Sequence, residues 1–505
     1  MSAKGVWLGN AAWPNNRSCG QFAKDVFRLS GAKTDKQKAL AFYDWIQRCM
    51  MRGANLHTPD GAGGYSRNYD PLVLLTSWGF GECTFWGWVC TECLCAAGLK
   101  ARRVVVHKQG HTYYEVWYKG DDGVEQWHAF DPYIGWYFLN ENGEVASCEQ
   151  LAKNPQLVQN PLPGHPVPLG SHPERSGLEH RHRTEDQVII EQPLRLEENA
   201  WDLKRGMEVT FNFMPEAPHK ALFTRHPAIG ELPVDNRPDG THDDIGEISR
   251  LGFRQYAKHI PYWKNYMWPT PNKNLRNEGQ PVRWHGAGAL RWAPLLVGAE
   301  GPSEAHYAVF ENGALRPKGS HCFCDVIYHI RLPYLISWLN VDYDVAGGGG
   351  DIFGLQVSAD DRRTWWPLKT PTNGPGWGEG SNGQAEWKKG EPSVQGLKEF
   401  WLRVNLLSHA AQPALVLQAL RIAVGFQHNM HVQPRLVPGA NPLWVEAGEL
   451  SAGAKIQAEW IYQIDGQEKR SFVGLSRAGK ADETVQLDVD CPSRIRMTGI
   501  RLSCV

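Results

Sequence analysis

Three side chains that could cooperate in nucleophilic catalysis lie within residues 78–139 of this 505-residue chain. Cys83 directly follows a Gly-Phe-Gly-Glu segment, while His111 and Asp131 belong to two later runs rich in aromatic and aliphatic residues. A thiol that attacks a carbonyl carbon, an imidazole that moves the proton and a carboxylate that orients the imidazole form a complete set for acyl transfer. We therefore predict a catalytic triad of Cys83, His111 and Asp131.

The elements that must position these residues follow from the local pattern. A helix is predicted from Cys83 to residue 97, ended by Gly98. The dipole at its amino terminus favours a thiolate, and the backbone N–H groups there favour an oxyanion. Strands are predicted over residues 102–107, 111–118 and 125–130, with a turn at 120–123. A helix followed by neighbouring antiparallel strands is sufficient to bring the three side chains together.

Four short motifs carry a resemblance to a known family. They are Gly-Glu-Cys at residues 81–83, LCAAGLKAR at 94–102, HTYYEV at 111–116 and WHAFDP at 127–132. Together they resemble the transglutaminase-like superfamily, which has a papain-like core and includes transglutaminases, peptide N-glycanases and related bacterial proteins. The resemblance implies an α+β domain in which Cys83 is the nucleophile, His111 the general base and acid, and Asp131 the residue that orients His111. The chain departs from the family at Thr112-Tyr113, where Ala-Trp is common.

Other residues near the predicted triad are candidates for substrate binding or for the oxyanion site. The amino-terminal candidates are Trp78, Asn68 and Tyr69, and those beside the triad are Tyr113 and Trp86. The two tyrosines beside His111, at positions 113 and 114, also allow a second chemistry, because a histidine and a tyrosine form the base and acid pair suited to β-elimination of uronic-acid polysaccharides. Whether the partner of His111 is the Cys83 thiol or a tyrosine phenol is left open by the sequence.

The remainder of the chain is predicted to be β-rich. Its 22 Trp, 33 Pro and 52 Gly are typical of β-sandwich modules with flat aromatic faces, including sugar-binding ones. We predict an α+β multidomain protein in which a transglutaminase-like domain (1–159) and a Pro- and His-rich linker (160–187) precede three β domains. These are a β-rich middle domain (188–320), a β-sandwich (321–432) and a small immunoglobulin-like β-sandwich (433–505).

Charge and composition restrict the partners. A net charge of −1 and a pI near 7.0 argue against nucleic-acid binding, and no apolar run is long enough to predict a membrane span. The amino terminus lacks the apolar segment of a signal peptide, but trimming of a secreted or periplasmic protein would leave the same sequence, so localisation stays open. The oligomeric state also stays open. The 11 cysteines do not form a disulfide framework, and Cys90-x-x-Cys93 lacks a suitable second pair for zinc.

Three functional hypotheses remain. The leading one is a cysteine-dependent amide hydrolase or acyl transferase that acts through a Cys83 thioester on a peptide or glycan-linked substrate; this mechanism requires no metal or organic cofactor. The second is a polysaccharide lyase in the same cleft, which uses His111 and a tyrosine. The third is a non-catalytic glycan-binding scaffold.

Overall fold

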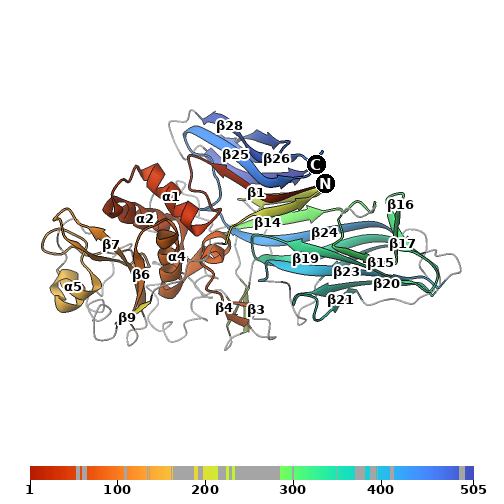
Figure 1. Ribbon diagram of the computed structural model, residues 1–505, viewed down its shortest axis with the longest axis horizontal. Helices are drawn as coiled ribbons and strands as arrows, with labels where there is room; N and C mark the ends of the chain where they lie inside the picture. Colours follow the sequence, from red (N-terminus) through yellow and green to blue (C-terminus); the bar gives the residue numbers. More distant parts are fainter. Residues whose placement is uncertain are drawn as a thin grey trace.

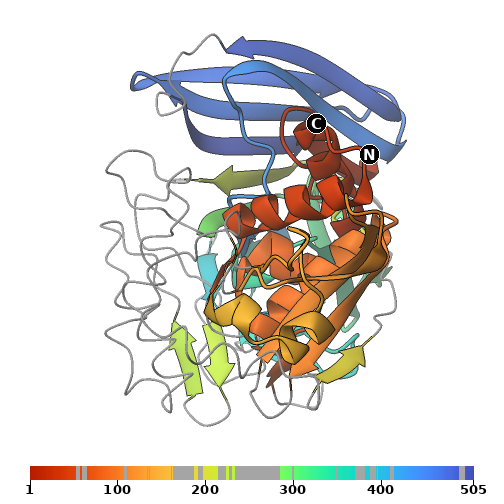
Figure 2. The same cartoon turned by 90° about the vertical axis from the view of Figure 1, so that its left-hand side faces the viewer.

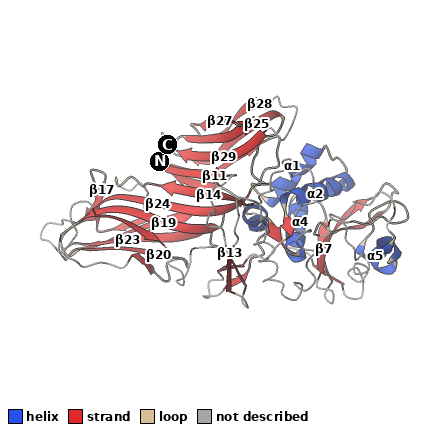
Figure 3. Ribbon diagram, turned by 180° about the vertical axis from the view of Figure 1, so that it is seen from behind, coloured by secondary structure: helices blue, strands red, loops and turns tan. Residues whose placement is uncertain are grey.

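The computed structural model combines a group of helices with several β-sheets, and most of its regular structure is strand (Figures 1 and 3). The prediction of a β-rich chain with several sheets is therefore confirmed. The structure describes residues 1–52, 57–59, 65–106, 111–133, 135, 137–160, 162, 187–190, 197–213, 223–226, 230–233, 285–297, 301–348, 350–369, 381–386, 394, 396–409, 415–487 and 495–505. Nearly all of the predicted linker 160–187 lies outside these residues.

The described helices all belong to the first 160 residues. They are α1 (Cys19–Ser30), α2 (Asp35–Cys49), α3 (Pro71–Val73), the π-helix η1 (Leu74–Trp78), α4 (Cys83–Ala96), α5 (Cys148–Lys153) and α6 (Gln156–Gln159). Ser18 caps α1, and Thr34 forms a capping box with Gln37 at the start of α2. Figure 1 shows α1, α2 and α4 between the sheet that contains β6 and β7 and the much larger β-rich part.

The sheet beside these helices has the order β8-β7-β6-β9 and is antiparallel throughout. Its strands are β6 (Ala101–Val106), β7 (His111–Lys119), β8 (Glu125–Phe130) and β9 (Gln187–Ile190). Alternation along β7 places Tyr114 and Val116 in the core shared with the helices, whereas Tyr113 faces a second small core near α5. The sheet is therefore covered on both faces, which fixes its register.

Short strands flank the helices. They are β2 (Met51–Arg52), β3 (His57–Pro59), β4 (Tyr65–Arg67), β5 (Phe80–Gly81), β12 (Phe223–His226) and β13 (Gly230–Pro233). β2 and β5 pair in parallel, which holds the segment that precedes α4 against the end of α2.

The large β-rich part contains sheets of ten, five and four strands. The first eight of its strands are β1 (Ser2–Asn10), β10 (Trp201–Lys204), β11 (Met207–Asn212), β14 (His285–Trp292), β15 (Glu304–His306), β16 (Ala308–Glu311), β17 (Ala314–Pro317) and β18 (Phe323–Arg331). The next five are β19 (Ile336–Ala346), β20 (Ile352–Ser358), β21 (Trp366–Lys369), β22 (Ser381–Glu386) and β23 (Glu399–Leu407). The last six are β24 (Val416–Asn429), β25 (Gly439–Leu450), β26 (Ile456–Ile464), β27 (Gln467–Leu475), β28 (Gly479–Leu487) and β29 (Ile495–Cys504).

Strand pairing links segments that are far apart in the chain. β1, at the amino terminus, pairs with β10 and with β25, and the two ends of the chain lie close together (Figures 1, 2 and 3). The ten-stranded sheet contains β11, β24 and β29, which come from three different predicted domains, and one continuous apolar core runs beneath these strands. The ten-stranded sheet thus takes strands from all three predicted β domains, because alternation along a strand does not specify its partner.

Asn429, at the end of β24, joins the sheets to the helices. It is 0% exposed, and its amide donates to the carbonyl oxygens of Cys49 (2.7 Å) and Leu75 (2.8 Å), while its side-chain oxygen accepts from the N–H of His431 (3.0 Å). Gly79 lies so close that a Cβ there would be 2.9 Å from Asn429 Cγ. The junction is therefore a closely packed and hydrogen-bonded contact.

Replacing Asn429 by alanine is expected to lower the free energy of unfolding by about 3 kcal/mol, because it leaves two buried carbonyl groups without a donor. Chemical denaturation of the variant measures this loss. Asn142→Ala, which removes an exposed asparagine from a turn, is the control and is expected to change stability by less than about 0.5 kcal/mol. Equal effects of the two substitutions would contradict this account of the junction.

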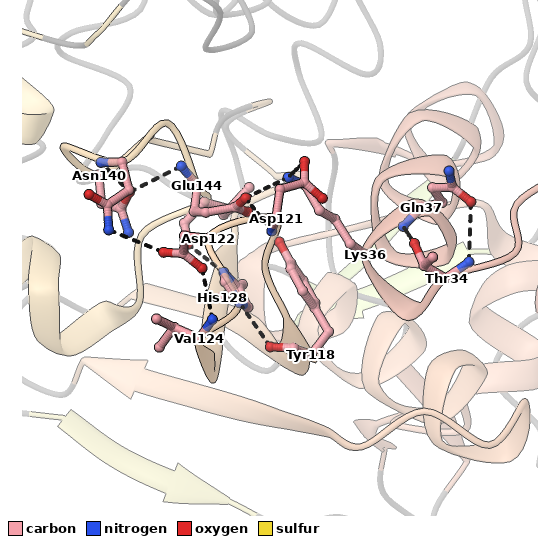
Figure 4. A network of polar contacts seen from close by, with 12 residues as sticks. Thr34, Lys36, Gln37, Tyr118, Asp121, Asp122, Val124, His128, Asn140 and Glu144 are labelled. Atoms are coloured by element: carbon pink, nitrogen blue, oxygen red, sulfur yellow. Dashed lines mark hydrogen bonds and ion pairs between the residues drawn. The ribbon is translucent and has the colours of Figure 1, made fainter.

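A polar network anchors the β7–β8 hairpin to α2 (Figure 4). Lys36 Nζ lies 2.7 Å from Asp121 Oδ2 and 2.8 Å from Glu144 Oε1, and the Glu144 side chain is only 2% exposed. The backbone N–H of Asp121 also donates to Glu144 (2.7 Å), and Asn140 accepts from the N–H of Glu144 (3.0 Å). Through its Oε1 atom, the buried Glu144 carboxylate holds the far end of the hairpin in place relative to the helices. Among the described residues, no helix is both long and apolar enough to cross a bilayer.

Candidate active site

Helix α4 begins at Cys83, as predicted. Its N-cap residue Glu82 has extended backbone geometry and makes no capping hydrogen bond with its own side chain. Gly81 is required just before it, because a Cβ there would lie 2.5 Å from the Cβ of Phe85. The Cys83 side chain is 9% exposed and sits at the positive end of the helix dipole, where a thiolate is stabilised.

His111 and Asp131 form a short, buried pair at neighbouring ends of β7 and β8. His111 Nε2 lies 2.5 Å from Asp131 Oδ2, and the two residues are 3% and 5% exposed. An ionised carboxylate only accepts hydrogen bonds, so Nε2 carries the proton and donates it to Asp131. The other ring nitrogen, Nδ1, is then the basic one.

The thiol of Cys83 completes the group. Burial alone would lower the pKa of His111, but the negative charge of Asp131, the hydrogen bond to Asp131 and a hydrogen bond to Cys83 outweigh burial and raise the pKa to about 9. The structure thus brings all three predicted residues together in hydrogen-bonding order. An imidazole with a raised pKa is well suited to hold the proton of a neighbouring thiol.

Surrounding contacts fix the strands that carry the histidine. Thr84 and Thr112 approach each other at 3.3 Å between hydroxyl oxygens, which links the first turn of α4 to the start of β7. On the other face of the sheet, Arg102 forms an ion pair with the buried Glu115 (2.7 Å), which also accepts from the backbone N–H of Cys148. β6, β7 and α5 are therefore joined around His111.

The candidates for substrate binding occupy different surroundings. Asn68 donates to the Thr58 hydroxyl and accepts from the Asp70 N–H, so it braces its own loop. Tyr69 is half-buried and packs against Phe85 and Trp88 (ring centroids 5.3 and 5.7 Å apart) on the α4 side of the site. Of the two, only Tyr69 packs against rings carried by α4.

Trp78, Trp86 and Tyr113 are core residues. Trp78 (2% exposed) ends η1, and Trp86 (3% exposed) packs within the helical core. Tyr113 is 1% exposed, its hydroxyl hydrogen-bonds with Cys148, and burial raises its pKa well above the ordinary value. These positions do not favour substrate contact by the two tryptophans, nor acid–base chemistry by Tyr113.

Three residues near the site were missed by sequence reasoning. Tyr133 has its ring centroid 6.1 Å from that of His111, and its position directly after Asp131-Pro132 could have suggested it. Trp88 is half-buried on the face of α4 that also carries Thr84, and the guanidinium of Arg103 lies 4.0 Å from its ring centroid. The spacing of residues 84 and 88 was the available signal for a shared helix face.

The His, Cys, Asp and Glu side chains in the described part of the chain do not cluster as metal ligands do. No group of three or more His, Cys, Asp or Glu side chains that could hold a metal ion occurs there. The ten described cysteines are all free thiols, and Cys90 and Cys93 are fully buried in α4.

Comparisons with known proteins give distant likenesses only. No protein-family model matches the chain, and no curated protein matches it. Red sea bream transglutaminase is similar over 96% of this chain and 72% of its own, with 10% identity and a TM-score of 0.19. The glycoside hydrolase domain of Endo-D from Streptococcus pneumoniae R6 is similar over 42% of this chain, with 11% identity and a TM-score of 0.14, and this chain spans 36% of that domain. TM-scores this low carry no functional weight, and the proposals below depend on the geometry of the site.

Proposed function

We propose that the protein is a cysteine-dependent amide hydrolase or acyl transferase of the transglutaminase-like kind, with Cys83, His111 and Asp131 as its catalytic residues. The observation that supports this most strongly is the hydrogen-bonded order of the three side chains, with the thiol at a helix amino terminus. The same order of thiol, imidazole and orienting group serves acyl transfer on unrelated folds.

The proposed reaction proceeds in two steps. Nδ1 of His111 holds the thiol proton while the sulfur of Cys83 attacks the amide carbon, and the backbone N–H groups at the start of α4 face the developing oxyanion. Collapse of the tetrahedral intermediate breaks the C–N bond, and the imidazolium gives its proton to the leaving amine. Water or a second amine then attacks the thioester, and the thiol is regenerated.

Selective alkylation tests the proposal. With limiting iodoacetamide we expect Cys83 to react before Cys95 and Cys322, although those two are more exposed, because His111 keeps the Cys83 sulfur in its reactive form. Peptide mapping by mass spectrometry measures the order. His111→Gln should slow labelling of Cys83 and leave Cys322 unchanged. Labelling in order of exposure would overturn the proposal.

A substrate assay separates this function from elimination. Glutamine-containing peptides are offered with and without a primary amine, and ammonia release is followed together with amine incorporation. Uronate polymers are assayed in parallel for unsaturated products that absorb in the near ultraviolet. Activity on uronates that survives Cys83→Ala would replace the thiol mechanism by a lyase mechanism.

A further inference from the structure

A buried cation with no carboxylate partner among the described residues lies beside the candidate active site. Arg103, on β6, is 4% exposed, and its Nε and Nη1 atoms have no hydrogen-bond partner in the part of the chain that the structure describes. Its neighbour Arg102 points to the other face of the sheet and is paired with Glu115. The two adjacent arginines therefore differ completely in how their charge is satisfied.

The position of Arg103 relative to Cys83 follows from its contacts. A Cβ on Gly87 would lie 3.1 Å from Arg103 Cδ and 2.9 Å from Thr112 Cγ2, so both side chains cross α4 at this glycine. Gly87 is four residues after Cys83, which is one helical turn, or about 6 Å along the axis. Arg103 thus packs against the face of α4 that also carries Cys83. It lies next to Thr112, the residue that follows His111.

Among the described residues, the guanidinium contacts aromatic rings and no carboxylate. It lies over the half-buried Trp88 (4.0 Å from the ring centroid), and Trp88 in turn packs against Tyr69. Burial lowers the pKa of Arg103, an effect that the nearby Tyr69 phenol opposes, yet a guanidinium stays charged at neutral pH. Contact with the face of an aromatic ring does not replace the hydrogen bonds that Nε and Nη1 of Arg103 lose on burial. Arg103 therefore still has two N–H groups that could donate to an anion.

We propose that Arg103 binds a carboxylate of the acyl donor, so that the substrate carries a negative charge close to the bond that Cys83 attacks. A guanidinium prefers carboxylates because its planar N–H groups match the two oxygens. The separation of about one helical turn corresponds to about two residues of extended substrate chain. This inference rests on the proposed function, since it takes Cys83 as the attacking group.

A matched pair of alkylating reagents tests whether Arg103 binds a carboxylate near Cys83. N-iodoacetylglycine ends in a carboxylate, and N-iodoacetylglycinamide is its neutral counterpart; in both, the sulfur of Cys83 forms a C–S bond and iodide leaves. We expect Cys83 of the wild type to react about 10-fold faster with the anionic reagent, and this preference to disappear in Arg103→Gln while the neutral rate is kept. Without a bound cation, repulsion by Asp131 and the thiolate would favour the neutral reagent.

The outcomes are separable. Absence of an anionic preference in the wild type, or its survival in Arg103→Gln, overturns the inference. Failure of the neutral reagent to label Cys83 ahead of Cys322 overturns the proposed function instead. Lys153→Gln, which removes one positive charge from an exposed pair on α5, is the control and should keep the wild-type preference.

The melting temperature of Arg103→Gln is a second test of the proposed role of Arg103. If Arg103 serves ligand binding, Arg103→Gln leaves no carboxylate unpaired, and its melting temperature should equal or exceed that of the wild type. A lower melting temperature with an unchanged reagent preference would make Arg103 a structural residue. Protection of Cys83 from alkylation by N-acetylglutamate would indicate a peptide carboxylate, and protection by glucuronate a uronate; protection by neither overturns the inference.

Discussion

Cys83→Ala is expected to abolish formation of an acyl-enzyme. In the wild type, p-nitrophenyl acetate should acetylate the sulfur of Cys83 and release one equivalent of p-nitrophenolate in a burst, because an ester of this kind requires only an activated nucleophile. The variant lacks that nucleophile, so the acylation rate should fall by about 10³-fold or more. Stopped-flow absorbance measures the burst, and intact-protein mass spectrometry measures the acetyl adduct.

A second thiol of the same helix provides the control. Cys90 is 0% exposed, and burial raises its pKa well above the ordinary value, so it cannot compete as a nucleophile. Cys90→Ala should therefore leave the burst unchanged. A burst that persists in Cys83→Ala, or that disappears in Cys90→Ala, would be inconsistent with Cys83 as the nucleophile.

Asp131→Ala is expected to have the second largest effect. Loss of the carboxylate frees the His111 ring to rotate and removes the charge that stabilises the imidazolium, so the acylation rate should fall by about 10³-fold. The pKa of His111 should fall from about 9 in the wild type. Histidine labelled with ¹³C and followed by NMR through a pH titration measures this change directly.

The same pair makes stability depend on pH in a defined direction. The pKa of His111 is about 9 in the folded protein and about 6.5 in an unfolded chain, so the pair contributes its full stability below pH 6.5 and loses it as the pH rises through 9. The difference in unfolding free energy between wild type and Asp131→Ala should shrink over this interval. Glu399→Gln, which breaks a half-exposed pair with His329 (3.0 Å), should show almost no such change. A difference independent of pH would contradict the assignment.

Local sequence determined the elements that carry the candidate site. The helix predicted from Cys83 to residue 97 is observed as α4, Cys83–Ala96, because an amino-terminal glycine turn and the following Gly98 limit it at both ends. β8 has the predicted bounds, and β7 extends one residue beyond them. Each of these boundaries depends on turn residues and alternation within a few positions, which a sequence displays directly.

Other features depend on residues far apart in the chain. No local pattern indicates that β1 pairs with β25, that η1 is held by Asn429, or that Tyr113 turns away from Cys83 toward Cys148. The sequence also does not distinguish Arg103 from its neighbour Arg102. What separates them is the face of β6 on which each lies: one meets Glu115 and the other meets Trp88. Types and spacing of residues thus predicted the candidate triad. Only the packing of α4 against the sheet decided which of the two arginines lacks a carboxylate partner among the described residues, because burial and partners are set by contacts across the fold.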